Sequence, residues 1–144
     1  MNGRKPTNPK DALGINKAPL STVPFGPLYE VGLAMLEGAR KYGRHNYRDM
    51  GVKASIYVDA AMGHIAAYWE GEDIDPDSNL HHIVKAIASL MVLRDSMLME
   101  NHIDDRPPRY PSGIGMMRNN VLVQDIIKKY PDCKEPFTWH KSGY

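Results

Sequence analysis

Residues 64–86 read HIAAYWEGEDIDPDSNLHHIVKA, and the fold of the chain is expected to depend on this stretch. An apolar segment with a single histidine, His64, runs into an acidic loop, and a second apolar segment follows it. This pattern predicts two antiparallel helices joined by a short loop. The loop holds four carboxylates within six residues, which repel one another unless water, a cation or basic side chains neutralise them. A divalent metal site is the simplest explanation, and a solvated acidic turn is the alternative.

Three helices are expected around this loop. Helical spacing of apolar residues predicts them over Pro27 to about Tyr42, over residues 54–70 and over residues 79–100. The helix over 54–70 is apolar nearly all round, which predicts that it is buried. The helix over 79–100 should be a core helix, and its polar stripe of His82, Lys85 and Ser89 needs partners if it is buried. These patterns predict an all-α fold.

Several polar residues of these segments have simpler roles as alternatives. A lone histidine such as His64 on an apolar helix is often a core residue with one hydrogen bond. Asp77 or Ser78 can cap the helix that follows the loop. Glu37 and Lys41 are four residues apart, which is the spacing of an ordinary exposed ion pair on a helix.

The segment KYGRHNYRDMG, residues 41–51, combines basic and aromatic side chains. Cationic side chains bind phosphate and aromatic faces stack on bases, so this is the strongest candidate for contacting a nucleotide. A polar loop is the alternative. Glycine at position 43 is typical of the end of the preceding helix.

The two ends of the chain differ in character from the helical region. Residues 1–27 are rich in Pro, Gly, Asn and Lys and predict an extended arm without helical periodicity. After residue 104 a Pro/Gly linker leads to a short amphipathic helix over 117–130 and an irregular tail, with Phe137 and Trp139 as expected anchors. We therefore expect a helical domain with its arm over 1–104 and an extension over 105–144 that packs on the bundle or on a neighbouring subunit.

The composition excludes several classes of protein. The 144 residues have a formal net charge of +1, which gives no sign of a nucleic-acid polymer or membrane partner. The one cysteine excludes an intrachain disulfide, and no apolar run has the length of a bilayer span, which together favour a soluble cytoplasmic protein. There is no Gly-rich phosphate loop and no zinc-type cysteine cluster. The pair His81-His82 also lacks the adjacent His-Asp of the HD phosphohydrolases.

Three strings resemble a known family. GARKYGRHNYR (38–48), YVDAAMGHIAAYWEGEDIDPDSNLHHIVKA (57–86) and, more weakly, NKAPLSTVP (16–24) resemble the phage dATP/dGTP diphosphohydrolases, small proteins related to the MazG-like pyrophosphohydrolases. The resemblance implies a MazG-like all-α bundle that forms a homo-oligomer and acts in the host cytoplasm. It implies Mg²⁺ or Mn²⁺ and the cleavage of dGTP or dATP to monophosphate and pyrophosphate, which would shape the nucleotide pool during infection.

The resemblance also assigns roles to residues of this sequence. The implied metal ligands are His64, Glu72, Asp75 and His82. The resemblance also carries Lys41, Tyr42, Asn46 and Arg48 over as a nucleotide-binding segment. For a metal-dependent pyrophosphohydrolase we further expect Glu72, Asp75 or Glu37 as the catalytic base, Lys85 as a phosphate contact and Trp69 as a contact to the nucleobase.

The sequence departs from the family pattern at four places. Gly63 stands where arginine is expected, Asn79-Leu80-His81-His82 where Gly-Leu-Pro-His is expected, and Tyr47 where tryptophan is expected. Lys85 stands where a second histidine is expected, and an ammonium group binds phosphate but cannot ligate a cation. Two alternatives to the enzyme follow. One is a catalytically silent nucleotide-binding protein, a sponge for a signalling nucleotide in host–phage conflict, and the other is a purely structural helical module.

Overall fold

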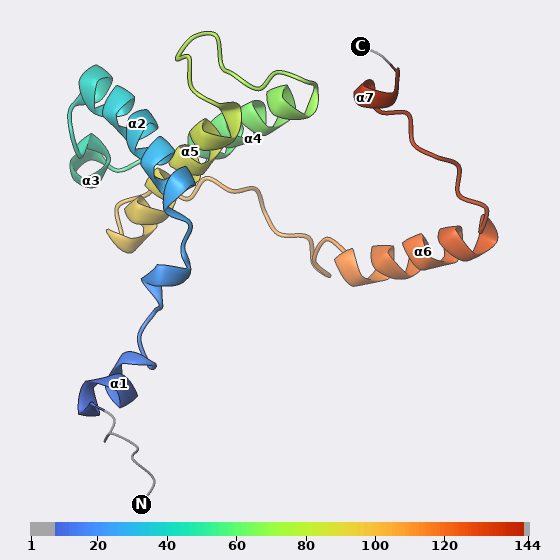
Figure 1. The fold of residues 1–144 in the computed structure, drawn as a ribbon, viewed down its shortest axis with the longest axis horizontal. Helices are drawn as coiled ribbons and strands as arrows, with labels where there is room; N and C mark the ends of the chain where they lie inside the picture. Colours follow the sequence, from blue (N-terminus) through green and yellow to red (C-terminus); the bar gives the residue numbers. More distant parts are fainter. Residues whose placement is uncertain (1–7, 143–144) are drawn as a thin grey trace, which may run out of the picture. The chain divides into compact units, whose positions relative to one another are not determined.

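A computed structural model describes residues 8–142 of the chain, and every regular element within this range is a helix (Figure 1). The expected all-α fold is therefore confirmed. The chain divides after Arg106 into two compact units, and each unit is described by itself. The first seven residues of the expected N-terminal arm lie outside the described range.

The bundle of the first unit consists of three long helices and the short helix α3. These are α2 (Phe25–Tyr42), α3 (Asn46–Met50), α4 (Ala54–Trp69) and α5 (His82–Leu98), and α5 packs against each of the other three. Helices α4 and α5 run antiparallel. The rings of Tyr68 and His81 lie 5.8 Å apart at one end of the pair, and the N–H of Ala54 donates to the carbonyl of Ile103 at the other.

The expected helices are present, with small differences at their ends. Helix α2 begins at Phe25, two residues before the expected start at Pro27. Pro27 thus lies in the first turn of α2, where proline is tolerated because the first backbone N–H groups of a helix have no partner within the helix. Gly43 ends α2 with φ of 95°, a conformation that glycine adopts without steric cost. The segment that follows, for which a polar loop was the alternative to a nucleotide-binding segment, forms the five-residue helix α3.

The prediction of an extended N-terminal arm was wrong for part of its length. Residues Pro9–Gly14 form α1 and residues Leu20–Thr22 form a 3-10 turn. Asn8 caps α1 because its side-chain oxygen accepts from the N–H of Lys10, and Pro9 occupies the first helical position, where its missing N–H costs nothing. A cap and a proline therefore start a short helix in a segment without helical periodicity.

Two small apolar clusters hold the bundle together. In the first, Val31 and Ala34 of α2 pack against Val84 and Ala88 of α5. The second lies near the C-terminal half of α5 and consists of Val52, Ala54, Val92 and Leu93. Burial of these side chains from two sides places α5 at the centre of the unit.

The expectation that α4 is a buried helix was wrong for the single chain. Only Ala54 and Ala61 of this helix are buried, while Met62 is 62% exposed and Trp69 is 82% exposed. The core-helix prediction for α5 was correct only in part, because Leu90 and Leu98 are also exposed. A helix that is apolar all round needs contacts on several sides, and α4 receives them mainly from α5.

The N-terminus of α4 is capped from a distant part of the chain. The N–H of Ser55 donates to the Asp105 carboxylate over 2.8 Å, and the Ser55 hydroxyl donates to the same carboxylate. Together with the bond from Ala54 to Ile103, this satisfies two of the N–H groups that a helix leaves unpaired at its start. A negative charge at this end is also favoured by the helix dipole.

The second unit contains α6 (Met116–Lys129) and α7 (Trp139–Ser142). Helix α6 confirms the expected amphipathic helix, although none of its residues is buried. Phe137 is fully exposed, and its expected role as an anchor stays a prediction. Among the residues described, no helix is both long and apolar enough to cross a membrane.

Candidate metal centre and adjoining pocket

The acidic loop between α4 and α5 is organised around Asp75. One oxygen of its carboxylate accepts from the N–H of Asp77 over 3.0 Å and the other from the hydroxyl of Ser78 over 3.1 Å. Its own N–H donates to the carbonyl of Leu80 over 2.8 Å. Partial burial alone would raise the pKa of Asp75, but these hydrogen bonds bring the pKa below its usual value. Asp75 is therefore an ionised carboxylate held in one position.

The expected cap of the second helix was assigned to the wrong residue. Neither Asp77 nor Ser78 caps α5, because the Ser78 hydroxyl bonds to Asp75. His81 is the N-cap instead, and its Nδ1 accepts from the N–H of Ile83 over 3.1 Å. The next residue, His82, is thereby placed in the first turn of α5, and its N–H donates to the carbonyl of Asp73.

His64 of α4 and His82 of α5 meet across the helix pair. Their Nδ1 atoms lie 2.8 Å apart, and their ring centroids are 5.1 Å apart. On its other side His82 contacts Glu72, whose Oε1 lies 2.7 Å from Nε2 of His82. His82 is buried, with 5% of its surface exposed. As is usual for buried polar groups, both of its ring nitrogens have a partner within the protein.

His64, Asp75 and His82 form the group that is suited to a metal ion. Each offers one ligand atom, and these atoms lie within 4.8 Å of one another. The structure thus brings together three of the four expected metal ligands, while Glu72 contacts the group through His82. Burial lowers the pKa of His64, although the Asp75 carboxylate acts in the opposite direction, and a neutral imidazole is the form that ligates a metal.

Glu37, the expected catalytic residue of α2, lies between two lysines. Its Oε1 is 2.5 Å from Nζ of Lys85 and 3.4 Å from Nζ of Lys41. The hydrogen bond from Lys85 is the main reason that the pKa of Glu37 is lowered, despite the opposing effect of burial. The expected Glu37–Lys41 pair is therefore present, and it is part of a larger cluster that joins α2 to α5.

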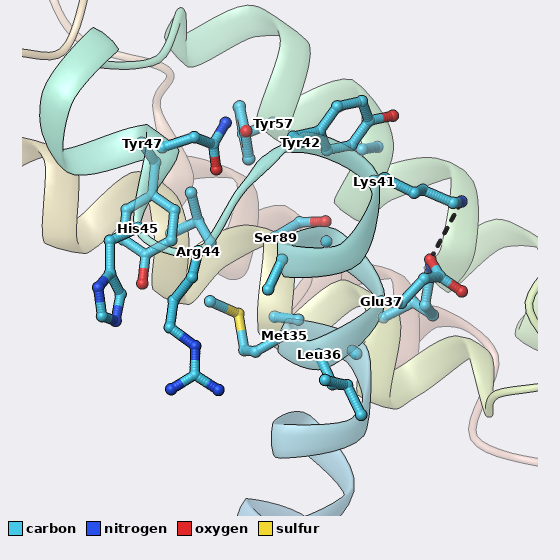
Figure 2. A pocket seen from close by; sticks show the side chains of 18 of the residues that line it. Met35, Leu36, Glu37, Lys41, Tyr42, Arg44, His45, Tyr47, Tyr57 and Ser89 are labelled. Atoms are coloured by element: carbon cyan, nitrogen blue, oxygen red, sulfur yellow. Dashed lines mark hydrogen bonds and ion pairs between the residues drawn. The ribbon is translucent and has the colours of Figure 1, made fainter.

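A pocket of about 460 Å³ opens beside this cluster, and residues of α2, α3, α4 and α5 line it. Figure 2 shows Glu37 and Lys41 together on one side of the pocket, joined by an ion pair. His45 and Tyr47 lie on the other side in the same view. His64 and Lys85 also line the pocket, so the candidate metal group and the ion-pair cluster both border the same space.

The structure brings four of the six expected nucleotide-binding residues to this pocket. Lys41, Tyr42, Asn46 and Lys85 belong to its lining. Two others lie elsewhere. The guanidinium of Arg48 makes two hydrogen bonds, of 3.0 and 2.9 Å, to the Asp95 carboxylate, which ties α3 to α5. Trp69, at the end of α4, is not part of the lining.

Two residues that shape the site were not singled out from the sequence. Tyr57 lines the pocket from α4, and burial raises the pKa of its hydroxyl. Asn101 holds α3 in place, because its Nδ2 donates to the carbonyl of Arg48 over 2.7 Å. Its Oδ1 accepts from Ser96, which is fully buried. The aromatic character of Tyr57 was a usable signal, whereas nothing local marks Asn101.

The fold and the site define an all-α protein with a candidate metal centre next to a pocket that carries lysines and aromatic rings. Residues 7–106 match the family described as dATP/dGTP diphosphohydrolase, N-terminal, and the chain belongs to this family. The matched range ends at Arg106, where the first compact unit also ends.

A related protein has the same name as this family. The chain is similar to a dATP/dGTP diphosphohydrolase of Salmonella phage PMBT28, with 29% identity over 120 residues. The match covers 83% of this chain but 39% of the relative, so the chain spans about two fifths of the relative's length. No solved structure matches the chain.

Proposed function

We propose that the protein hydrolyses purine deoxynucleoside triphosphates, dGTP or dATP, to the monophosphate and pyrophosphate. The observation that carries the proposal is the place of His64. This side chain belongs to the group that is suited to a metal and also lines the pocket that contains Lys41 and Lys85. A substrate in the pocket would therefore have its phosphates close to both the ligand group and the two cations. The names of the family and of the relative support a hydrolase of this kind.

His64, Asp75 and His82 would hold the divalent cation. The set of two imidazoles and one carboxylate suits Mn²⁺ better than Mg²⁺, because Mg²⁺ prefers oxygen ligands and retains most of its water. When bound, the cation would neutralise charge on the phosphate oxygens and lower the pKa of a bound water.

The pocket supplies groups for both parts of a nucleotide. Its volume of about 460 Å³ lies within the range of roughly 300–1,000 Å³ that is common for ligand sites. Lys85 and Lys41 carry two positive charges against the one negative charge of Glu37, which leaves an excess cation for phosphate. Tyr42 and Asn46 line the same pocket and offer a stacking face and amide hydrogen bonds to a base.

The test is a panel of deoxynucleoside and ribonucleoside triphosphates incubated with Mn²⁺ or Mg²⁺, with the products separated by chromatography. We expect monophosphate and pyrophosphate from a purine deoxynucleotide, and no turnover after chelation. Release of inorganic phosphate instead of pyrophosphate would contradict the proposed bond cleavage. Equal turnover with excess chelator would contradict the metal.

One observation favours a second candidate, a nucleotide-binding protein without turnover. Lys85 stands where the family resemblance implies a histidine, and its ammonium is bound to Glu37, the proposed catalytic carboxylate. A carboxylate held by two lysines is a weak proton acceptor because its pKa is lowered. Recovery of intact nucleotide from a tight stoichiometric complex would favour this candidate.

A further inference from the structure

We propose that Glu72 is a positioning residue that fixes the tautomer of His82, so that the Nδ1 atom of His82 faces His64 and the ligand group. The inference rests on the proposed function, because the fixed Nδ1 lone pair of His82 has a role only if the ligand group binds a cation. It changes the role of Glu72 from metal ligand to partner of a ligand.

The first step of the argument concerns which atom donates. A carboxylate can only accept, so the contact of 2.7 Å between Glu72 Oε1 and His82 Nε2 requires a hydrogen on that nitrogen. In neutral imidazole only one nitrogen carries a hydrogen. The Nδ1 atom of His82 is then the one with a free lone pair.

The second step concerns the direction of that lone pair. Nδ1 of His82 lies 2.8 Å from Nδ1 of His64, and His64 in turn belongs with Asp75 to the group whose ligand atoms lie within 4.8 Å. The same nitrogen is thus aimed at the place where three ligand atoms converge. In the absence of a cation, His64 donates its Nδ1 hydrogen to this lone pair.

The third step concerns Glu72 itself. Its side chain is 54% exposed, whereas that of His82 is 6% exposed, so the carboxylate covers the outer nitrogen of a buried ring. Glu72 is not a member of the group of convergent ligand atoms. Histidines that ligate metals commonly donate their other N–H to a carboxylate, which orients the ring and raises its basicity.

The experiment compares Glu72→Ala and Glu72→Gln with the wild type. Glu70→Ala is the matched control, because it removes an exposed carboxylate two residues away. Long-range ¹H–¹⁵N spectra of the metal-free proteins report which nitrogen of His82 carries hydrogen, and His82→Asn assigns the signal. Calorimetry with Mn²⁺ alone reports the affinity of the ligand group.

We expect the Nε2–H tautomer of His82 in the wild type and in Glu72→Gln, because a glutamine oxygen also accepts. Glu72→Ala should populate the other tautomer and lower the Mn²⁺ affinity by roughly 10–100-fold, the usual effect of losing such a partner. Glu72→Gln should retain most of the affinity, and Glu70→Ala should resemble the wild type.

Two results would overturn the inference. One is an equal loss of Mn²⁺ affinity in both Glu72 variants without a change of tautomer, which would make Glu72 a ligand. The other is an unchanged His82 tautomer in Glu72→Ala. If the wild type binds no Mn²⁺, the metal in the proposed function fails, and the spectra alone still decide the role of Glu72.

Discussion

The Nζ atom of Lys85 lies 2.5 Å from Oε1 of Glu37, and this contact joins α5 to α2 at the wall of the pocket. Both side chains are about four-fifths covered, with 17% and 22% of their surfaces exposed. The ion pair therefore contributes to holding the pocket together, and it also places a cation beside the ligand group.

The first prediction concerns stability at low pH. Folding lowers the pKa of Glu37 below its ordinary value of 4.5. Its carboxylate therefore stabilises the fold fully above pH 4.5, and this contribution is lost as the pH falls through the lower pKa of the folded state. Glu37→Gln should lower the free energy of unfolding at pH 7 by about 1.5–3 kcal/mol, the usual range for a hydrogen bond to a charged group. The difference from the wild type, measured by urea unfolding, should shrink in acid. A difference that is independent of pH would contradict this.

The second prediction concerns the role of Lys85 in binding substrate. Removal of its ammonium in Lys85→Ala should raise KM for the preferred triphosphate roughly 10-fold or more, because a charge-assisted hydrogen bond to phosphate is lost. Lys53→Ala removes a lysine outside the pocket lining and is the control. Steady-state kinetics separate KM from kcat. An unchanged KM would place the phosphates away from Lys85.

The third prediction concerns the ligand group. Asp75→Asn should lower the affinity for Mn²⁺ by at least about 10-fold, since a neutral amide is a much weaker ligand than a carboxylate. Asp77→Asn changes a carboxylate of the same loop that is outside the group of three and should bind Mn²⁺ as the wild type does. Calorimetric titration measures both. Equal losses in the two variants would indicate a diffuse effect of loop charge instead of a defined site.

The fourth prediction concerns the attachment of α3. Gly51 has φ of 71°, and a Cβ atom at this position would lie 2.1 Å from the carbonyl oxygen of Asn101. Gly51→Ala should therefore lower the free energy of unfolding by about 1–3 kcal/mol or more. Gly63→Ala is the opposite case, because the added methyl group meets nothing within 4 Å in the middle of α4, and it should stabilise by up to about 1 kcal/mol. Thermal unfolding compares the two. Equal melting temperatures would contradict the close approach.

The fifth prediction concerns association. The expected homo-oligomer would cover the exposed apolar residues of α4, which include Met62 and Ile65. Sedimentation should give a mass above 16.2 kDa for the wild type, and Met62→Glu should shift the protein towards this monomer mass. A monomeric wild type at tens of micromolar would contradict the expectation.

Much of the fold could be predicted because its signals are local. Helical spacing located the ends of α2, α4 and α5 within three residues, and Gly43 marked the end of α2. Burial was predicted less well. The apolar surface of α4 predicts a buried helix, but the extent of its burial depends on how many neighbouring helices the single chain provides.

The candidate site was predictable in part, because the sequence shows which helix each of its histidines belongs to. His64 and His82 could be placed on adjacent helices, but their contact depends on helix rotation, which the spacing does not determine. Spacing also does not decide the role of Glu72, since a carboxylate beside a histidine is compatible with ligand and partner alike. The cap from Asp105 to Ser55 joins residues fifty positions apart, and no local pattern indicates such a pair.

The hydrogen bonds around Asp75 have a thermodynamic consequence. A loop that must be ordered by its ligand loses conformational entropy at the moment of binding, by roughly 1–2 kcal/mol for each residue that is fixed. In this loop Asp75 is already fixed by Asp77, Ser78 and Leu80. The ordering occurs when the chain folds, so a cation at this carboxylate would meet a preorganised partner, and its binding should show little of the unfavourable entropy that loop closure brings.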